Sequence, residues 1–464
     1  MSFQSLKFLV FLTITVALCL AVGRKKQVAG KTCLLLCSLL FCFQSKGFLV
    51  LGAGVAVSAL AVRYLTSGKS ENGRKKVLTA ACLWHIAVLC AFKYLPFGWS
   101  PVGISFFTFQ QVWLLKETYT RQFRPNTTED LLLHAAFFPC LTSGPILRPG
   151  NFFPQLHSTC FLRPDWQDIS AGLYAICIGM AKKMLLADPI GGIVDNGWAM
   201  VDTLSAPAAW LVILGYTLQL YLDFSGYCDI ATGIARLLGI RLPANFNSPY
   251  HARSVTDFWK RWHITLTTFL RECVYFPLGG SRKGSGRAYA NILIVFLISG
   301  IWHGTGWTFL IWGALHGLAQ IAERALGNRR AHLPTWAQWC LTFLFVNFAW
   351  VFFRAPDLSS ATALFSSAVS GGWSLSLSAL TAGVLDSEVT AITTLLPMLT
   401  HYMPALLTAA LLAIGMTVIL WPQNTLEKMD TFKPRAAHGV LLAVLMVWAV
   451  LSFSSEATFI YSNF

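Results

Sequence analysis

The sequence of 464 residues is 55% hydrophobic and only 12% charged, whereas soluble domains typically carry about 25% charged residues. Its net charge of +15 comes from basic residues in short loops between apolar runs, so it does not indicate a nucleic-acid-binding protein. The composition excludes an ordinary soluble domain and predicts an all-α polytopic membrane protein.

We expect about 11–12 transmembrane helices, because each crossing takes about 20 apolar residues. One membrane domain, residues 1–464, should cover the chain, since no internal repeat or linker interrupts it. Residues 131–147 contain Pro139, Gly144 and Pro145 and are typical of a re-entrant piece, and residues 357–386 of an external loop with short helices. The expected crossings lie near residues 6–23, 32–45, 47–63, 77–96, 101–116, 168–187, 206–222, 288–302, 304–322, 335–353, 402–421 and 437–455.

The basic loops predict the orientation of these helices. Lysine and arginine gather in cytoplasmic loops, so residues 24–26, 74–76, 282–287 and 329–330 should face the cytoplasm. The first apolar run carries its basic cluster after it, unlike a cleaved signal peptide. This apolar run is therefore predicted to be a membrane anchor, with the N-terminus outside the cytoplasm.

The twelve cysteines lie mostly in apolar runs, and none forms a CxxC pair. Cysteine in such a setting is typically a small buried hydrophobe. We therefore expect no metal site.

Residues 236–288 combine a loop with an amphipathic segment. The loop is broken by Pro243 and Pro249, and Ser254 then starts a helix in which apolar side chains recur at helical period as far as Val274. His263 falls on this stripe and is either a hydrogen-bonded core residue or a site residue. Lys260 and Arg261 fall off the stripe, where they would face lipid headgroups or a ligand phosphate. The helix should lie on, or dip into, the cytoplasmic side.

Residues 288–322 form a stretch without Asp, Glu, Lys or Arg that is too long for one crossing. As a single helix it would extend roughly 50 Å, against a hydrocarbon core of about 30 Å. The glycines Gly300, Gly304 and Gly306 predict a break, and they should leave room for a substrate beside His303. Broken helices at membrane depth are tolerated inside protein or beside a water-filled cavity. We therefore expect this stretch to line an internal passage or cavity. Residues 389–426 form a still longer uncharged stretch, and each of the two stretches should be broken or doubled.

Ionisable side chains at membrane depth are costly and usually functional. The candidates are Asp223, His263, His303 and His316. His316 would lie about 220° around a continuous helix from His303, so we assign it a structural role. Histidine can exchange a proton near neutral pH, and the residues alone leave structural and catalytic roles for His303 equally open.

Four segments resemble the membrane-bound O-acyltransferase family, in its bacterial polysaccharide branch of the alginate O-acetyltransferase type. They are GISFFTFQ at 103–110, FFPCLTSGPILRPGNFFPQL at 137–156, the block from LYLDFSGYCDIATG to PLGGSR at 220–282, and GIWHGTGWTFLIWGALHG at 300–317. The resemblance is strong over about residues 100–320. D-alanyl transfer proteins share FWKRWH and WHG but usually lack PLGGSR, which favours acetyl transfer.

The resemblance implies a ring of helices around a thin central region with a through-tunnel. In it His303 is the catalytic histidine and His263 a second active-site residue. Less specifically, it implies a donor and substrate passage, lined by Trp262, Trp302, Trp307, Asp223, Lys260 and Arg261. His303 would act as general base on an acceptor hydroxyl, or would carry the acyl group covalently. His263 would orient it or polarise the thioester.

The resemblance also implies the setting of the reaction. The protein would reside in the bacterial cytoplasmic (inner) membrane, in contact with the lipid bilayer. It would bind no cofactor, and would use an acyl thioester, acetyl-CoA or an acyl carrier, as co-substrate. The acyl group would leave outward, to an extracytoplasmic acetyltransferase or a polysaccharide-synthesis complex, for acetylation of an exopolysaccharide such as alginate or cellulose.

Three alternatives remain beside this reading. The chain could transfer D-alanine or another acyl group to a cell-wall polymer. It could be a proton-coupled transporter, although such proteins typically contain internal repeats. It could also be a non-catalytic assembly subunit of polysaccharide export, which would not need His303 in this position.

Overall fold

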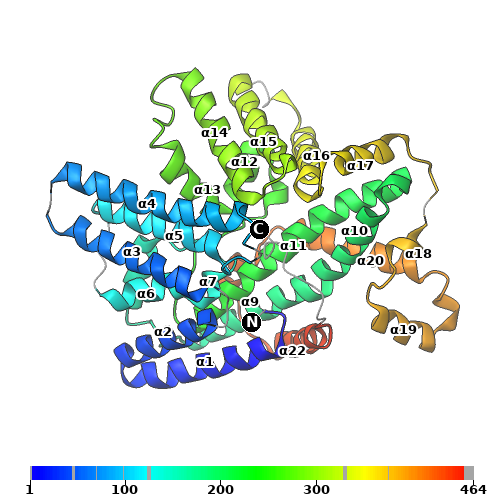
Figure 1. Ribbon diagram of the computed structural model, residues 1–464. Coiled ribbons are helices and arrows are strands. Elements are labelled where there is room, and N and C mark those ends of the chain that lie inside the picture. Colours follow the sequence, from blue (N-terminus) through cyan, green and yellow to red (C-terminus); the bar gives the residue numbers. More distant parts are fainter. Residues whose placement is uncertain are drawn as a thin grey trace. The chain divides into compact units, whose positions relative to one another are not determined.

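The computed structural model describes residues 3–43, 47–68, 70–97, 99–122, 127–327, 332–374 and 376–453, and these form helices and loops without a β-strand (Figure 1). Within this part, seven helices are long and apolar enough to cross a membrane, and three shorter apolar helices accompany them. The prediction of an all-α polytopic membrane protein is therefore confirmed. The seven are Leu6–Lys25, Phe48–Thr66, Glu71–Tyr94, Trp166–Ala199, Ala206–Leu237, Ser285–His303 and Thr335–Arg354, and the shorter ones are Gln27–Phe43, Met403–Ile419 and Ala436–Leu451.

The chain divides into two compact units, which we describe separately. The first contains residues 1–180, 227–245 and 425–464, and the second contains residues 181–226 and 246–424. In the first unit, helices form at the five expected crossings nearest the N-terminus. These are α1 (Leu6–Lys25), α2 (Gln27–Phe43), α3 (Phe48–Thr66), α4 (Glu71–Tyr94) and α5 (Ile104–Tyr119).

The segment expected to be re-entrant is broken into short buried helices in the first unit. A capping box between Thr127 and Asp130 starts the first of them, and Phe137 separates it from the second, which contains Pro139. No span forms here, as predicted. The helices are α6 (Thr128–Ala136), α7 (Phe138–Leu141) and α8 (Pro149–Leu156), and later parts of the chain add α9 (Trp166–Ala181), α21 (Thr425–Thr431) and α22 (Ala436–Leu451).

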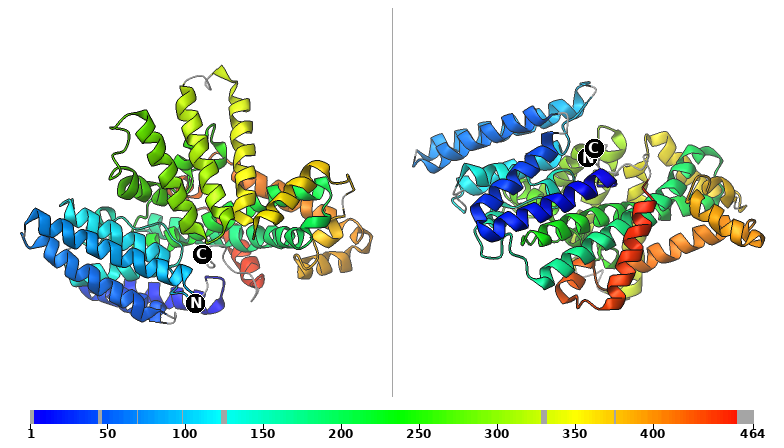
Figure 2. Two further views of the ribbon diagram at one scale, coloured as in Figure 1. Left: turned by 45° about the horizontal axis from the view of Figure 1, so that its top comes forward. Right: turned by 90° about the horizontal axis from the view of Figure 1, so that it is seen from below.

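The second unit contains all of the predicted site residues. Its helices α14, α15 and α16 lie side by side in both figures (Figures 1 and 2). In chain order the unit contains η1 (Lys182–Ala187), α10 (Asp188–Ala199), η2 (Val201–Thr203), α11 (Ala206–Leu237) as far as Gly226, η3 (Pro249–His251), α12 (Val255–Arg261), α13 (Ile264–Leu270), η4 (Arg271–Tyr275), α14 (Ser285–His303), α15 (Trp307–Leu326), α16 (Thr335–Arg354), α17 (Leu358–Ser370), α18 (Leu377–Leu380), α19 (Asp386–Leu395), η6 (Pro397–Leu399) and α20 (Met403–Ile419).

Two helical segments are much longer than expected. The run Trp166–Ala199 has 34 residues and α11 has 32, whereas the predicted crossings covered residues 168–187 and 206–222. Hydropathy ends a segment at polar residues, but here those residues are buried and paired. Lys183, for example, is an ion-pair partner of both Asp188 and Asp223. Internal partners let the helices continue where the apolar pattern stops.

The single helix predicted from Ser254 onward is wrong. The helix stops at Arg261, Trp262 is extended, and His263 takes a left-handed conformation with φ 44° and ψ 52° before α13 begins. The predicted apolar stripe is nevertheless buried as far as Leu270. Because the same face stays apolar on both sides of the break, periodicity does not reveal it.

Both breaks predicted in over-long apolar stretches are confirmed. The helix α14 ends at His303 and α15 begins at Trp307. Residues 389–426 contain α19, η6 and α20 in place of one helix. The predicted cytoplasmic loop at residues 329–330 lies outside the described residues.

Candidate active site

His303 is the last residue of α14 and is only 3% exposed. Its imidazole lies among three aromatic rings, with centroid distances of 4.5 Å to Trp302, 5.1 Å to Trp312 and 4.9 Å to Phe353. The Trp312 and Phe353 rings meet it edge to face. Aromatic side chains therefore enclose the His303 imidazole.

The glycines beside His303 serve close packing, and the expectation that they leave space for a substrate is wrong for two of them. A Cβ atom on Gly300 would lie 2.5 Å from the Phe309 carbonyl oxygen, and one on Gly304 would lie 2.1 Å from the Phe309 ring. Only Gly306 has ordinary van der Waals room, with Thr308 Oγ1 at 3.4 Å. Gly300 and Gly304 thus let the start of α15 fold back against α14.

His263 occupies the break between α12 and α13 and is 1% exposed. The Phe224 ring meets it edge to face at 4.8 Å, and the Trp302 ring lies 6.4 Å away. Burial lowers the pKa of His263 to about 3, so the ring is neutral at physiological pH. A neutral imidazole offers one donor and one acceptor nitrogen.

Trp302 lies beside both histidines. Its ring centroid is 4.5 Å from that of His303 and 6.4 Å from that of His263, so the two imidazoles are no farther apart than the sum of these distances. The structure thus brings together three residues that the sequence singled out. They belong to one buried aromatic cluster of the second unit.

Trp262, directly before His263, extends this cluster. It is fully buried, stacks on Phe258 at 5.5 Å and contacts Trp350 at 5.1 Å. Further rings around it are Tyr221, Phe246 and Tyr250. The indole therefore fixes one side of the break at which His263 sits.

Three of the predicted passage residues lie apart from this cluster. Trp307 starts α15 and is 73% exposed. Lys260 is exposed, and Arg261 donates from Nε to Asp257 at 2.9 Å. These three side chains are exposed or half-buried, unlike those of the aromatic cluster.

Asp223 is 1% exposed and belongs to a buried charge cluster that the sequence reasoning missed. Lys183 Nζ lies 2.7 Å from Asp223 Oδ1 and 2.5 Å from Asp188 Oδ1. Lys183 belongs to the π-helical turn η1, a local geometry that is frequent at functional sites. The adjacent Phe224 packs on His263, which links the charge cluster to the site. The available signal was a lysine pair, Lys182 and Lys183, inside an apolar run.

His316 has a defined packing contact. The Trp259 indole N–H donates to His316 Nδ1 at 3.1 Å, which leaves the ring proton on Nε2. The ring is fully buried and meets Trp312 edge to face at 5.2 Å. These contacts support the structural interpretation of His316.

Helix α12 is held at its N-terminus by two caps. Ser254 Oγ accepts from the Asp257 N–H at 2.9 Å, as the capping pattern predicted. The Glu323 carboxylate, from α15, accepts from the N–H groups of Val255 at 2.7 Å and Thr256 at 2.9 Å. A negative charge is favourable at a helix N-terminus, so Glu323 ties α12, which precedes His263, to α15, which follows His303.

Comparison with known proteins identifies the family. The pattern of the membrane-bound O-acyltransferase family matches residues 57–360, a range that contains both histidines. Relatives include the peptidoglycan O-acetyltransferase of Helicobacter pylori, 38% identical over 73% of each chain, and a probable alginate O-acetylase AlgI of Pseudomonas aeruginosa, 35% identical over 71% of this chain and 68% of that protein. The teichoic acid D-alanyltransferase of Bacillus subtilis is 29% identical over 47% of this chain and 58% of that protein. The chain therefore belongs to the membrane-bound O-acyltransferase family and is an acyltransferase.

Proposed function

We propose that the protein moves an acetyl group from a cytoplasmic thioester across the membrane for O-acetylation of an extracytoplasmic polysaccharide. The observation that carries this proposal is the similarity to the Helicobacter pylori peptidoglycan O-acetyltransferase, over 73% of both chains. The similarity to a D-alanyltransferase is lower in identity and covers less of the chain. Acetyl transfer is therefore favoured over D-alanyl transfer.

His303 acts as general base in the proposed reaction. It accepts the proton of an acceptor hydroxyl as the oxygen attacks the thioester carbonyl, the carbon–sulfur bond breaks, and the thiolate leaves and is protonated. His263 orients His303 or polarises the carbonyl. The aromatic rings around both histidines support this role, because apolar walls exclude the water that would otherwise hydrolyse the thioester.

The donor is acetyl-CoA or an acyl carrier that reaches the site from the cytoplasm. The protein lies in the bacterial cytoplasmic membrane with its N-terminus outside, so the basic runs 24–26, 74–76 and 282–287 face the donor side. The acetyl group passes to an extracytoplasmic acetyltransferase or a polysaccharide-synthesis complex. Labelling of cysteines introduced at exposed positions of these basic runs tests the orientation, and labelling from outside would contradict it.

The central experiment measures ester-linked acetate and ester-linked D-alanine on surface polysaccharides of cells with and without the gene. We expect acetate to disappear on deletion and to return with the wild-type gene. D-alanine loss with unchanged acetate would contradict acetyl transfer. Unchanged levels of both esters would contradict polysaccharide acylation altogether.

A further inference from the structure

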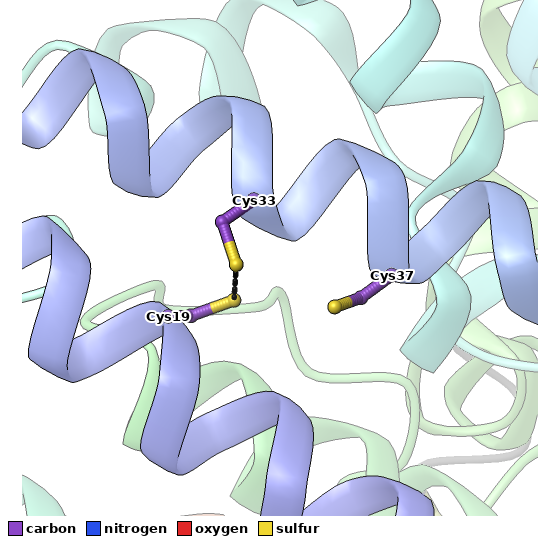
Figure 3. A group of neighbouring side chains, drawn as sticks. All are labelled: Cys19, Cys33 and Cys37. Carbon is purple, nitrogen blue, oxygen red and sulfur yellow. Dashed lines mark hydrogen bonds between the residues drawn. The ribbon is translucent and has the colours of Figure 1, made fainter.

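Three cysteines of the first two helices come together in the first unit. Cys19 belongs to α1, and Cys33 and Cys37 belong to α2. The sulfurs of Cys19 and Cys33 are 3.7 Å apart, and all three sulfurs lie within 4.8 Å of one another. Figure 3 shows the Cys37 thiol pointing toward the other two. The spacing in sequence resembles no metal motif, so the expectation that all cysteines are isolated small hydrophobes missed this cluster.

A glycine contact sets the distance between the two helices. A Cβ on Gly30 of α2 would lie 2.5 Å from the Gly23 Cα of α1, so the two backbones touch there. Cys19 lies one turn before Gly23, and Cys33 lies one turn after Gly30, on the antiparallel neighbour. Cys37 follows Cys33 by four residues and shares its face. The three thiols thus form the next layer beyond a close helix–helix contact, which holds them at fixed separation.

The geometry suits one class of metal ion. Three sulfurs that each lie about 2.3 Å from a central metal are about 4 Å apart, close to the separations seen here. Thiolates select soft ions such as Cu(I), whereas carboxylate, carbonyl and water ligands suit Mg²⁺, Ca²⁺ and Mn²⁺. Structural Zn²⁺ is almost always four-coordinate, and this group offers three ligands. A trigonal, all-sulfur site therefore favours Cu(I).

Positively charged side chains lie near this position. The exposed residues Arg24 and Lys25 end α1, and the exposed Lys26 joins it to α2, about 10 Å along the helices from the Cys19 and Cys33 sulfurs. A Cu(I) ion with two or three thiolates carries net negative charge, which these cations offset.

We propose that Cys19, Cys33 and Cys37 bind one Cu(I) ion and thereby fasten α1 to α2. The site belongs to the first unit and uses none of the residues assigned to acyl transfer. It stands independently of the proposed function.

The test uses full-length protein purified in detergent, reduced and kept under argon. Cu(I) is supplied as its acetonitrile complex, and bicinchoninate competes for it. We compare wild type with the triple variant C19S/C33S/C37S and with a matched triple variant, C82S/C90S/C340S. Wild type and the matched variant should retain one more tightly bound Cu(I) than C19S/C33S/C37S. X-ray absorption of the bound copper should show three sulfur neighbours.

The outcomes decide the proposal. Equal Cu(I) content in all three proteins would overturn it, and so would a Cys19–Cys33 disulfide in protein alkylated during cell lysis. Should the triple variant fail to accumulate, C37A decides alone, because this half-buried thiol can be removed with little cost to packing. Loss of the third sulfur should weaken Cu(I) binding at least about tenfold, and an unchanged affinity overturns the proposal.

Discussion

The two proposed histidines both sit where a helix ends, but the chain turns in different ways at the two places. At His303 the helix α14 finishes in regular geometry, and the glycine that follows takes the extended conformation. At His263 the histidine itself takes the left-handed conformation that joins α12 to α13. The first histidine is followed by a residue in a conformation open to any amino acid, whereas the second itself takes the unusual conformation and is also a side chain of the proposed site.

This difference explains why one break is readable in the sequence and the other is not. The glycines and the excess length of the apolar stretch indicate the break after His303. At the second, a non-glycine residue with positive φ bears a conformational cost that the burial of Phe224, Trp262 and Trp302 around it must outweigh. Such residues cluster at active sites, which agrees with the proposed role of His263.

The largest expected effect belongs to His303→Gln. Gln retains hydrogen-bonding groups but does not accept a proton at neutral pH, so acyl transfer should fall by about 10²–10⁴-fold while protein level stays near wild type. The measurement is ester-linked acetate, normalised to membrane protein. His401→Gln, at an exposed histidine, is the matched control and should leave activity unchanged. An active His303→Gln would remove proton transfer from the mechanism.

Substitutions of His263 separate its two roles. Asn accepts the left-handed conformation better than most residues, so His263→Asn should keep the thermal stability of the detergent-purified protein and still lose most of its activity. His263→Ala should lose activity and also stability, because a left-handed conformation costs alanine roughly 1–2 kcal/mol. His263→Gly should unfold at a higher temperature than His263→Ala. If Ala and Asn variants prove equally stable, the left-handed turn is not a constraint in solution.

For the candidate site, the sequence indicated which side chains are buried, but not how they pack. An ionisable or aromatic residue within an apolar segment can be recognised in the sequence. The residues recognised in this way are buried: His263, His303, Trp262, Trp302 and Asp223. The packing of Phe309 on two glycines and the ion pairs of Lys183 with two carboxylates depend on how helices fold against one another. The contact between Cys19 and Cys33 also depends on helix packing, and hydrophobic periodicity does not predict it.

Alanine substitutions of the glycines near His303 test whether that break depends on close packing. Gly300→Ala would drive a Cβ into the Phe309 backbone, and overpacking of this kind typically costs about 1–3 kcal/mol. We expect a lower unfolding temperature and a partial loss of activity. Gly306→Ala, which has room for a methyl group, is the matched control. Equal losses in both variants would show that backbone freedom, and not space, is what the glycines supply.

The smallest effect should come from Glu323→Gln, which touches neither histidine. The amide keeps one acceptor oxygen for the two N–H groups at the start of α12 but replaces the other with a donor and loses the negative charge. Charge at a helix N-terminus is typically worth 0.3–1 kcal/mol. Since α12 leads directly into the left-handed turn, a loosened start should disturb His263 more than His303. We therefore expect a small drop in unfolding temperature, and combined with His263→Asn the variant should cause little further loss of activity. If the double variant instead loses the full additional activity, Glu323 acts on His303 through α15. The effect on His263 that the capping contacts at α12 predict would then be contradicted.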